Sequence, residues 1–119
     1  HLFNVYLHIT KREKTMKREV EVLKENIKKD YAAWMSSDEM IERFNTGVKT
    51  TEGKKWIKVI QGSSVWGFIA KENGTHKGIP HKKGDTFKAA GWAAPAKWAR
   101  GNIFDTNTNW FSWTGPNYL

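Results

Sequence analysis

Hydrophobic residues recur at helical spacing in the first third of the chain. Steps of three or four residues separate them, and the series consists of Met16, Val20, Leu23, Ile27, Tyr31 and Trp34. Such steps place all of these side chains on one face of an α-helix, while lysine and glutamate fill most of the other positions. The pattern predicts an amphipathic helix from Met16 to Trp34 whose apolar face packs on a sheet.

A second, shorter helix is predicted between Ser36 and Gly47. Ser36 precedes Glu39 by three residues, which is the spacing of a capping box at a helix N-terminus. The apolar stripe of this helix consists of Met40, Ile41 and Phe44. Glycine is frequent at the end of a helix, so Gly47 marks the expected C-terminus.

After Gly47 the chain changes to short runs of β-branched and aromatic residues. Residues 56–61 and 65–70 are two such runs, and the Gly-Ser-Ser turn between them predicts a β-hairpin. Residues 71–85 are polar and rich in turn formers, so we expect a long connection there. Further strands are predicted at residues 86–90, 102–104 and 109–113.

Helices followed by a meander of strands are typical of the α+β class. We therefore predict an N-terminal helix and a short second helix packed on a small antiparallel sheet of about five strands, which is curled or forms a partly open barrel. With 119 residues, of which 39% are hydrophobic, the chain is long enough for one modest core. A single domain covering residues 16–119 is expected.

Residues 1–15 differ from the rest of the chain because their hydrophobic residues follow no consistent helical or strand period. In addition, codons for Lys11, Arg12 and Glu13 can spell a purine-rich ribosome-binding sequence shortly before Met16. We therefore expect a non-native or flexible extension at residues 1–15, with Met16 as the natural start. An ordinary N-terminal strand or arm is the alternative.

The chain is strongly basic, with a formal net charge of +8 and a pI near 9.8. This charge favours an anionic partner, nucleic acid first, and anionic lipid or an acidic protein after it. The absence of cysteine excludes disulfides, thiolate metal sites and a cysteine nucleophile. No apolar run reaches membrane-spanning length and no segment has the pattern of a secretory signal, so we expect a soluble cytoplasmic protein with no membrane partner.

The positive charge is concentrated beside an unusual aromatic segment. Residues 76–100 contain six basic residues and one acidic residue, whereas residues 16–45 contain six basic and seven acidic residues. Basic side chains near exposed aromatic rings are typical of proteins that grip single-stranded nucleic acid. The predicted contact residues are Lys82, Lys83, Lys88, Trp92, Lys97, Trp98 and Arg100. The alternative is that the tryptophans are core residues beneath a solvated basic loop.

Candidates for catalysis or metal binding are few. His76, His81 and Asp85 are the candidates for a metal site, but their spacing matches no tight ligand pattern and the basic residues around them repel cations. Phosphate-binding glycine loops and the Gly-x-Ser-x-Gly elbow are absent. We expect no metal, no cofactor and no catalytic residue.

Residues 84–97 read Gly-Asp-Thr-Phe-Lys-Ala-Ala-Gly-Trp-Ala-Ala-Pro-Ala-Lys, and the sequence Ala-Arg-Gly-Asn-Ile-Phe follows at residues 99–104. Together with the run Ser-Val-Trp-Gly-Phe-Ile upstream, this segment resembles a group of small uncharacterised proteins of tailed bacteriophages. The chain departs from that pattern at Thr86, where the group has a hydrophobic residue, at Gly91, where serine is common, and at Trp98. The resemblance covers roughly residues 54–105. It implies a phage gene product acting in the bacterial cytoplasm, and it indicates no activity.

These observations leave three classes of function. The first is a non-enzymatic phage-type protein that contacts nucleic acid through its basic, tryptophan-bearing strands, with binding that weakens steeply as salt rises. The second is an inhibitor of a host protein, or a minor virion component, that uses the same surface for protein contact. The third is a small-ligand binder or an enzyme around His76, His81 and Asp85, and an enzyme is the less favoured class.

Overall fold

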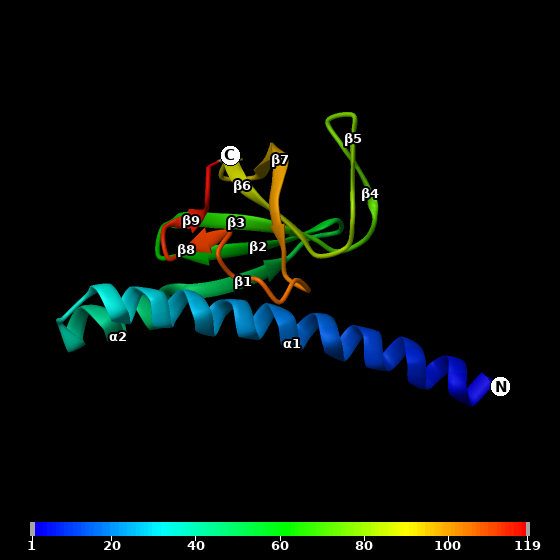
Figure 1. Ribbon diagram of the computed structural model, residues 1–119, viewed down its shortest axis with the longest axis horizontal. Helices are drawn as coiled ribbons and strands as arrows, with labels where there is room; N and C mark the ends of the chain where they lie inside the picture. Colours follow the sequence, from blue (N-terminus) through cyan, green and yellow to red (C-terminus); the bar gives the residue numbers. More distant parts are fainter. Residues whose placement is uncertain (1, 119) are drawn as a thin grey trace.

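Two helices precede nine strands in the computed structural model, which describes the backbone of residues 2–118 and the side chains of residues 16–118. The helices are α1 (Leu2–Trp34) and α2 (Asp38–Gly47). The strands are β1 (Val48–Glu52), β2 (Trp56–Gln61), β3 (Ser64–Ala70), β4 (Gly74–His76), β5 (Ile79–His81), β6 (Asp85–Gly91), β7 (Ala94–Asn102), β8 (Phe111–Ser112) and β9 (Gly115–Pro116). The predicted α+β class is confirmed (Figure 1).

Helix α1 buries the apolar stripe that its sequence predicts. Val20, Leu23, Ile27 and Tyr31 are each no more than 7% exposed and lie in the core. Trp34 ends the stripe but is 66% exposed, so its predicted place on the buried face is wrong. It lies in the last turn of α1, where the chain turns toward α2 and leaves much of the ring in solvent.

The helical backbone continues without a break from Leu2 through Met16, and its N-terminal end projects past the sheet (Figure 1). The predicted extension at residues 1–15 falls on residues whose side chains lie outside the described part of the structure, and it stays a prediction. Within residues 2–118, no helix has both the length and the apolar composition that crossing a lipid bilayer requires.

Helix α2 has a different cap from the predicted one. Its N-cap is Ser37 rather than Ser36, because Ser37 is the extended residue directly before the first helical residue, Asp38. The Ser37 hydroxyl accepts a hydrogen bond from the Met40 N–H at 3.4 Å. The helix ends at Gly47, as predicted.

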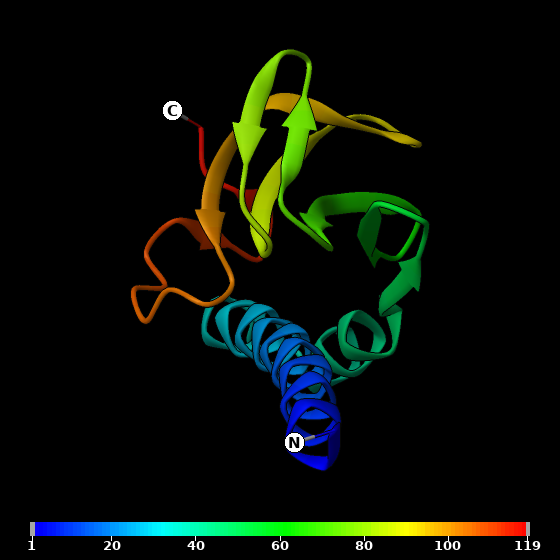
Figure 2. The same cartoon turned by 90° about the vertical axis from the view of Figure 1, so that its right-hand side faces the viewer.

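The main sheet is antiparallel and has the strand order β1-β2-β3-β6-β7. The predicted hairpin is β2–β3, and the strand predicted at residues 86–90 is β6. Because neighbouring strands twist relative to one another, the sheet curls over α1 (Figure 2). It does not close into a barrel, so β1 and β7 are its two edges.

Strand β7 corrects the strand predicted at residues 102–104. It runs from Ala94 to Asn102, and the chain turns directly after it. Its pairing with β6 contains several register shifts, so its side chains do not alternate in the regular way that a sequence pattern reveals. Pro95 is compatible with this strand because β7 lies at an edge of the sheet.

Two small hairpins lie outside the main sheet. Strands β4 and β5 pair within the connection predicted at residues 71–85. Strands β8 and β9 pair near the C-terminus, so the strand predicted at residues 109–113 is reduced to Phe111–Ser112 in a separate sheet. These strands are only two or three residues long. They are stabilised by packing on the rest of the fold, and not by a local sequence preference. Strand β1 is a further element that the sequence pattern did not indicate.

A bulge in β3 directs Trp66 into the core. The register between β2 and β3 shifts between Val59 and Ile60, which leaves Trp66 without a partner residue on β2. An extra residue of this kind changes the direction of its side chain. Trp66 is 4% exposed, and its indole N–H donates a hydrogen bond to the Ser112 carbonyl at 2.9 Å.

The C-terminal hairpin completes the core where the two helices meet. The Trp113 ring lies edge-on to Tyr31 of α1 and Phe44 of α2, with ring centroids 5.0 and 5.9 Å apart. The Trp113 backbone N–H donates to the Asp30 carboxylate at 2.8 Å. The last strands therefore pack on the first helices.

Candidate nucleic-acid interface

The β6–β7 hairpin presents two exposed tryptophans. Gly91 pairs with Ala94, so Trp92 lies in the turn between the strands, and Trp98 follows on β7. Trp92 is 57% exposed and Trp98 is 48% exposed. The alternative that these two rings belong to the core is therefore wrong. Trp66, by contrast, is a core residue.

Each exposed tryptophan has a lysine ammonium close to its ring. Lys58 Nζ lies 4.6 Å from the ring centroid of Trp92 and 5.9 Å from that of Phe68. Lys97 Nζ lies 5.4 Å from the Trp98 ring. The Lys58–Trp92 and Lys97–Trp98 distances both fall within the range of cation–π attraction. Lys58 was missed from the sequence because it belongs to β2, and only the curl of the sheet brings it to the tip of the β6–β7 hairpin.

Lys88 and Arg100 lie toward the C-terminal segment of the chain. Lys88 Nζ is 4.1 Å from the ring centroid of Tyr118. Partial burial, together with the positive charge of Arg100, lowers the pKa of Lys88. Arg100 donates hydrogen bonds from Nη1 to the Asn117 carbonyl at 2.8 Å and from Nε to the Trp98 carbonyl at 3.3 Å. In this arrangement Arg100 ties the C-terminal segment to β7.

Lys82 and Lys83 precede β6, and their backbone groups shape the turn there. The Lys82 N–H donates to the Asp85 carboxylate at 2.9 Å. The Lys83 N–H donates to the Asn73 side-chain carbonyl at 2.8 Å, and its own carbonyl accepts from the Asn102 amide at 3.0 Å. The Lys82 side chain is exposed, whereas the Lys83 side chain lines a cavity beside α1.

The two histidines belong to an aromatic cluster on the outer face of the sheet. His76 and His81 both lie against Trp56 of β2 and Phe87 of β6, with ring centroids 5.2 to 6.0 Å apart. His76 Nε2 lies 3.2 and 3.0 Å from the carbonyl oxygens of residues 95 and 96, so it links the β4–β5 hairpin to β7.

The third metal candidate, Asp85, is bonded elsewhere. Its carboxylate accepts hydrogen bonds from the Lys82 N–H and from the Asn102 side-chain amide at 2.9 and 3.0 Å. Among the residues that the structure describes, no group of three histidine or acidic side chains is arranged to hold a metal ion. His76 and His81 therefore share an aromatic cluster, whereas Asp85 bonds to the turn before β6 and to Asn102.

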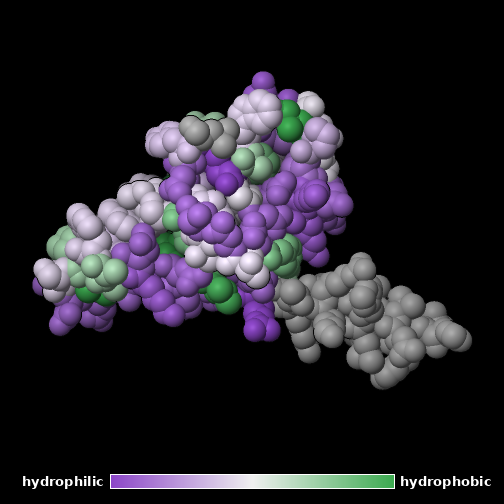
Figure 3. Space-filling view, viewed as in Figure 1, coloured by the Kyte–Doolittle hydropathy of each residue, from purple (hydrophilic) through white to green (hydrophobic). Residues whose placement is uncertain are grey.

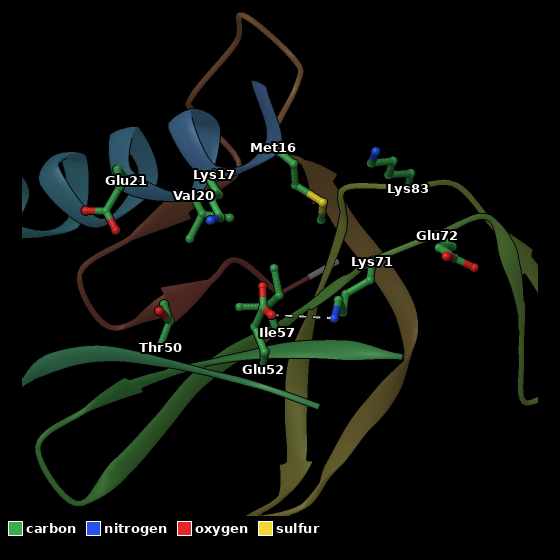
Figure 4. A pocket seen from close by; sticks show the side chains of 10 residues that line it. All are labelled: Met16, Lys17, Val20, Glu21, Thr50, Glu52, Ile57, Lys71, Glu72 and Lys83. Atoms are coloured by element: carbon green, nitrogen blue, oxygen red, sulfur yellow. Dashed lines mark ion pairs between the residues drawn. The ribbon is translucent and has the colours of Figure 1, made fainter. Parts of the chain in front are cut away.

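A cavity of about 770 Å³ lies between α1 and the edge of the sheet. Its lining consists of Met16, Lys17, Val20, Glu21, Thr50, Glu52, Ile57, Lys71, Glu72 and Lys83. Figure 4 shows Met16 and Val20 pointing from α1 toward the strands, with Thr50 on the opposite side. The cavity was not predicted because its walls come from five separate segments of the chain.

A group of hydrophobic residues also lies at the other end of the molecule. In Figure 3, green residues gather near the end where α1 meets α2, and purple residues cover much of the strands in that view. Trp34 and Met40, which belong to this end, are 66% and 44% exposed. Trp34 is thus an exposed tryptophan outside the basic segment.

Residues 7–118 match DUF7717, a family of unknown function. The chain belongs to this family. The matched region includes nearly all of α1, all of α2 and every strand described above, so the exposed tryptophans and the cavity both lie within the DUF7717 region. No curated protein and no solved structure matches the chain.

Proposed function

We propose that this protein binds single-stranded nucleic acid through Lys58, Trp92, Lys97 and Trp98, which we call the tryptophan surface. The observation that carries the proposal is that two exposed indole rings on one hairpin each have a lysine ammonium within 5.4 Å. Unpaired bases stack on such rings while cationic side chains neutralise the phosphates.

A single strand suits the tryptophan surface better than a duplex, because the bases of a duplex are already stacked on one another. The four residue-to-residue steps from Ala94 to Trp98 span at most about 13 Å at strand spacing. That length accommodates roughly four nucleotides at the phosphate spacing of a stacked strand. We propose that Trp92 and Trp98 stack on separate bases of one strand.

The surrounding charge supports the same partner. Six basic residues and one acidic residue lie within residues 76–100. Lys82 and Lys88 are proposed as additional phosphate contacts at the border of the surface. Arg100 is proposed to act through its hydrogen bonds to the C-terminal segment and to the Trp98 carbonyl, which hold β7 in place.

Tryptophan fluorescence titrated with short single-stranded DNA and RNA at several salt concentrations tests the proposal. Saturable quenching is expected. Trp92→Ala and Trp98→Ala should each weaken binding by about 1–3 kcal/mol, or roughly 5- to 150-fold. Lys58→Gln and Lys97→Gln should each reduce the slope of log K against log salt by about 0.7.

Trp34→Ala is the matched control, since Trp34 is as exposed as Trp92 but lies at the α1–α2 end. It should bind like the wild type. The proposal is refuted if no quenching occurs at low salt, or if Trp34→Ala weakens binding as much as Trp92→Ala.

A protein partner at the tryptophan surface, either a host protein or a virion component, is the alternative proposal. It predicts a stable complex recovered from nuclease-treated bacterial lysate that Trp92→Ala abolishes. The resemblance to tailed-phage proteins supports a phage gene product acting in the bacterial cytoplasm, and both partners fit that setting.

A further inference from the structure

Strand β1 is an edge strand, and its hydrogen-bonding pattern shows which of its backbone groups face outward. Gly62 N–H donates to the Gly47 carbonyl at 2.9 Å, and Gly53 N–H donates to the Trp56 carbonyl at 2.8 Å. In an antiparallel pair, every second residue bonds to the neighbouring strand. The odd-numbered residues from 47 to 53 therefore bond to β2.

The even-numbered residues of β1 point their N–H and C=O groups away from the sheet. Val48 N–H is used by the helix cap, where it bonds to the Asn45 carbonyl. Thr50 and Glu52 follow, and no hydrogen bond among the described residues joins their backbone groups to a partner. Such an edge is a template for one more strand.

The cavity beside α1 borders this part of the edge. Thr50 and Glu52 line the cavity together with Ile57 of β2 and with Met16 and Val20 of α1 (Figure 4). Since Glu52 pairs directly with Ile57, their side chains share the face of the sheet that is turned toward α1. A strand added beside Thr50 and Glu52 would place its inward side chains against Met16 and Val20.

The charges around the cavity favour acidic side chains in such a strand. Lys71 Nζ lies 3.6 Å from the Glu52 carboxylate, and Lys24 Nζ lies 3.3 Å from the Glu21 carboxylate. These ion pairs neutralise two of the three glutamates in the lining. Lys17 and Lys83 then face a single remaining acid, Glu72, within a protein of net charge +8.

We infer that the groove between β1 and α1 binds an extended peptide segment of another protein that carries both apolar and acidic side chains on the one strand face turned toward α1. The peptide adds to β1 as an antiparallel or parallel strand through the backbone groups of Thr50 and Glu52. Apolar side chains pack on Met16 and Val20, and acidic side chains lie near Lys17 and Lys83. Strand addition of this kind takes its affinity from main-chain hydrogen bonds and its specificity from alternate side chains.

Fluorescence anisotropy with labelled short peptides tests the inference on the full chain. A peptide in which valine and glutamate take turns at every second position, with threonine between them, presents both side chains on one face and should bind. The same peptide with lysine in place of glutamate should bind about tenfold more weakly because of the charge. A version of the first peptide with every backbone amide N-methylated keeps its side chains but cannot pair, so its binding should be lost.

Two substitutions at one position separate backbone pairing from side-chain packing. Thr50→Pro removes the outward N–H without removing a bond to β2, and proline is tolerated on edge strands. It should weaken binding about tenfold. Thr50→Val keeps the N–H and the shape of the side chain and should bind like the wild type, while thermal melts check that both variants fold.

Amide hydrogen exchange gives a readout that does not depend on either variant. Bound peptide should slow exchange at Thr50 and Glu52, and Trp92→Ala should leave this effect unchanged because the tryptophan surface is a different site. The inference fails if the valine–glutamate peptide does not bind at millimolar concentration, or if the N-methylated peptide binds equally well. It also fails if protection at Thr50 and Glu52 already rises with protein concentration alone, which would assign the groove to a second copy of the chain.

Discussion

Gly67 of β3 lies close to the backbone of β6, and replacing it with alanine gives a sharp test of the packing. A Cβ at this position would lie 2.7 Å from the Phe87 carbonyl oxygen and 3.3 Å from Pro116 Cγ. Ordinary carbon–oxygen contacts in sheets are about 3.3–3.6 Å, so the added methyl overlaps the β6 backbone by about 0.6 Å. A backbone carbonyl cannot rotate away as a flexible side chain can.

The expected cost of Gly67→Ala follows from this overlap. Overpacking a well-packed site destabilises a protein by about 1–3 kcal/mol. For a chain of this size, 1 kcal/mol corresponds to roughly 4 °C in Tm, so a decrease of about 4–12 °C is expected. Thermal denaturation followed by circular dichroism, together with urea unfolding, measures the change.

Gly91→Ala is the matched control in the same sheet. A Cβ at Gly91 meets nothing within 4 Å, so the same substitution there adds no overlap and should leave Tm unchanged or slightly higher. If Gly67→Ala is as stable as Gly91→Ala, then β3 does not approach β6 and β9 as closely as described, and the account of this region is refuted.

Two further changes test the packing around the C-terminal segment. Trp113→Ala should lower the free energy of unfolding by about 3 kcal/mol in urea titrations, because the ring packs edge-on against the stacked rings of Tyr31 and Phe44. The control Trp98→Ala, at an exposed position, should cost less than about 0.5 kcal/mol, and equal effects would contradict the packing. The pKa of Lys88 is lowered in the folded chain. Between that pKa and the ordinary value of 10.5, the unfolded chain therefore binds more protons at this site than the folded chain does. Stability consequently rises with pH in this window. Lys88→Met should therefore remove part of that rise in thermal melts across the window, and it should raise Tm near neutral pH. Lys97→Met, at an exposed position, is the control. An unchanged pH dependence in Lys88→Met would contradict the assigned burial of Lys88.

The sequence predicted the elements that depend on local spacing. The stripe from Val20 to Tyr31 is buried as its period indicates, α2 ends at Gly47, and β2 and β3 form the predicted hairpin. The basic, tryptophan-bearing segment was also visible, because charge and composition can be counted along the chain. In each case the residues that decide the outcome are neighbours in sequence, so a helical or strand period carries the information.

Tertiary structure decided which of these residues meet. Lys58 lies over Trp92 because the sheet curls, and Trp66 enters the core because β3 contains an extra residue. Strand β7 was not predicted at its full length because its register shifts remove the alternation of buried and exposed side chains that marks a strand.

The contacts that close the fold join residues far apart in the chain. The hydrogen bond from Trp113 to Asp30 spans 83 residues, and the groove beside β1 has walls from both the first helix and the strands. Local preferences fix backbone conformation over a few residues, whereas sheet order, free edges and cavities depend on how the whole hydrophobic surface is buried at once. The sequence therefore predicted Trp92 and Trp98 as candidate residues. It did not predict their exposure, their lysine partners or the open edge of β1.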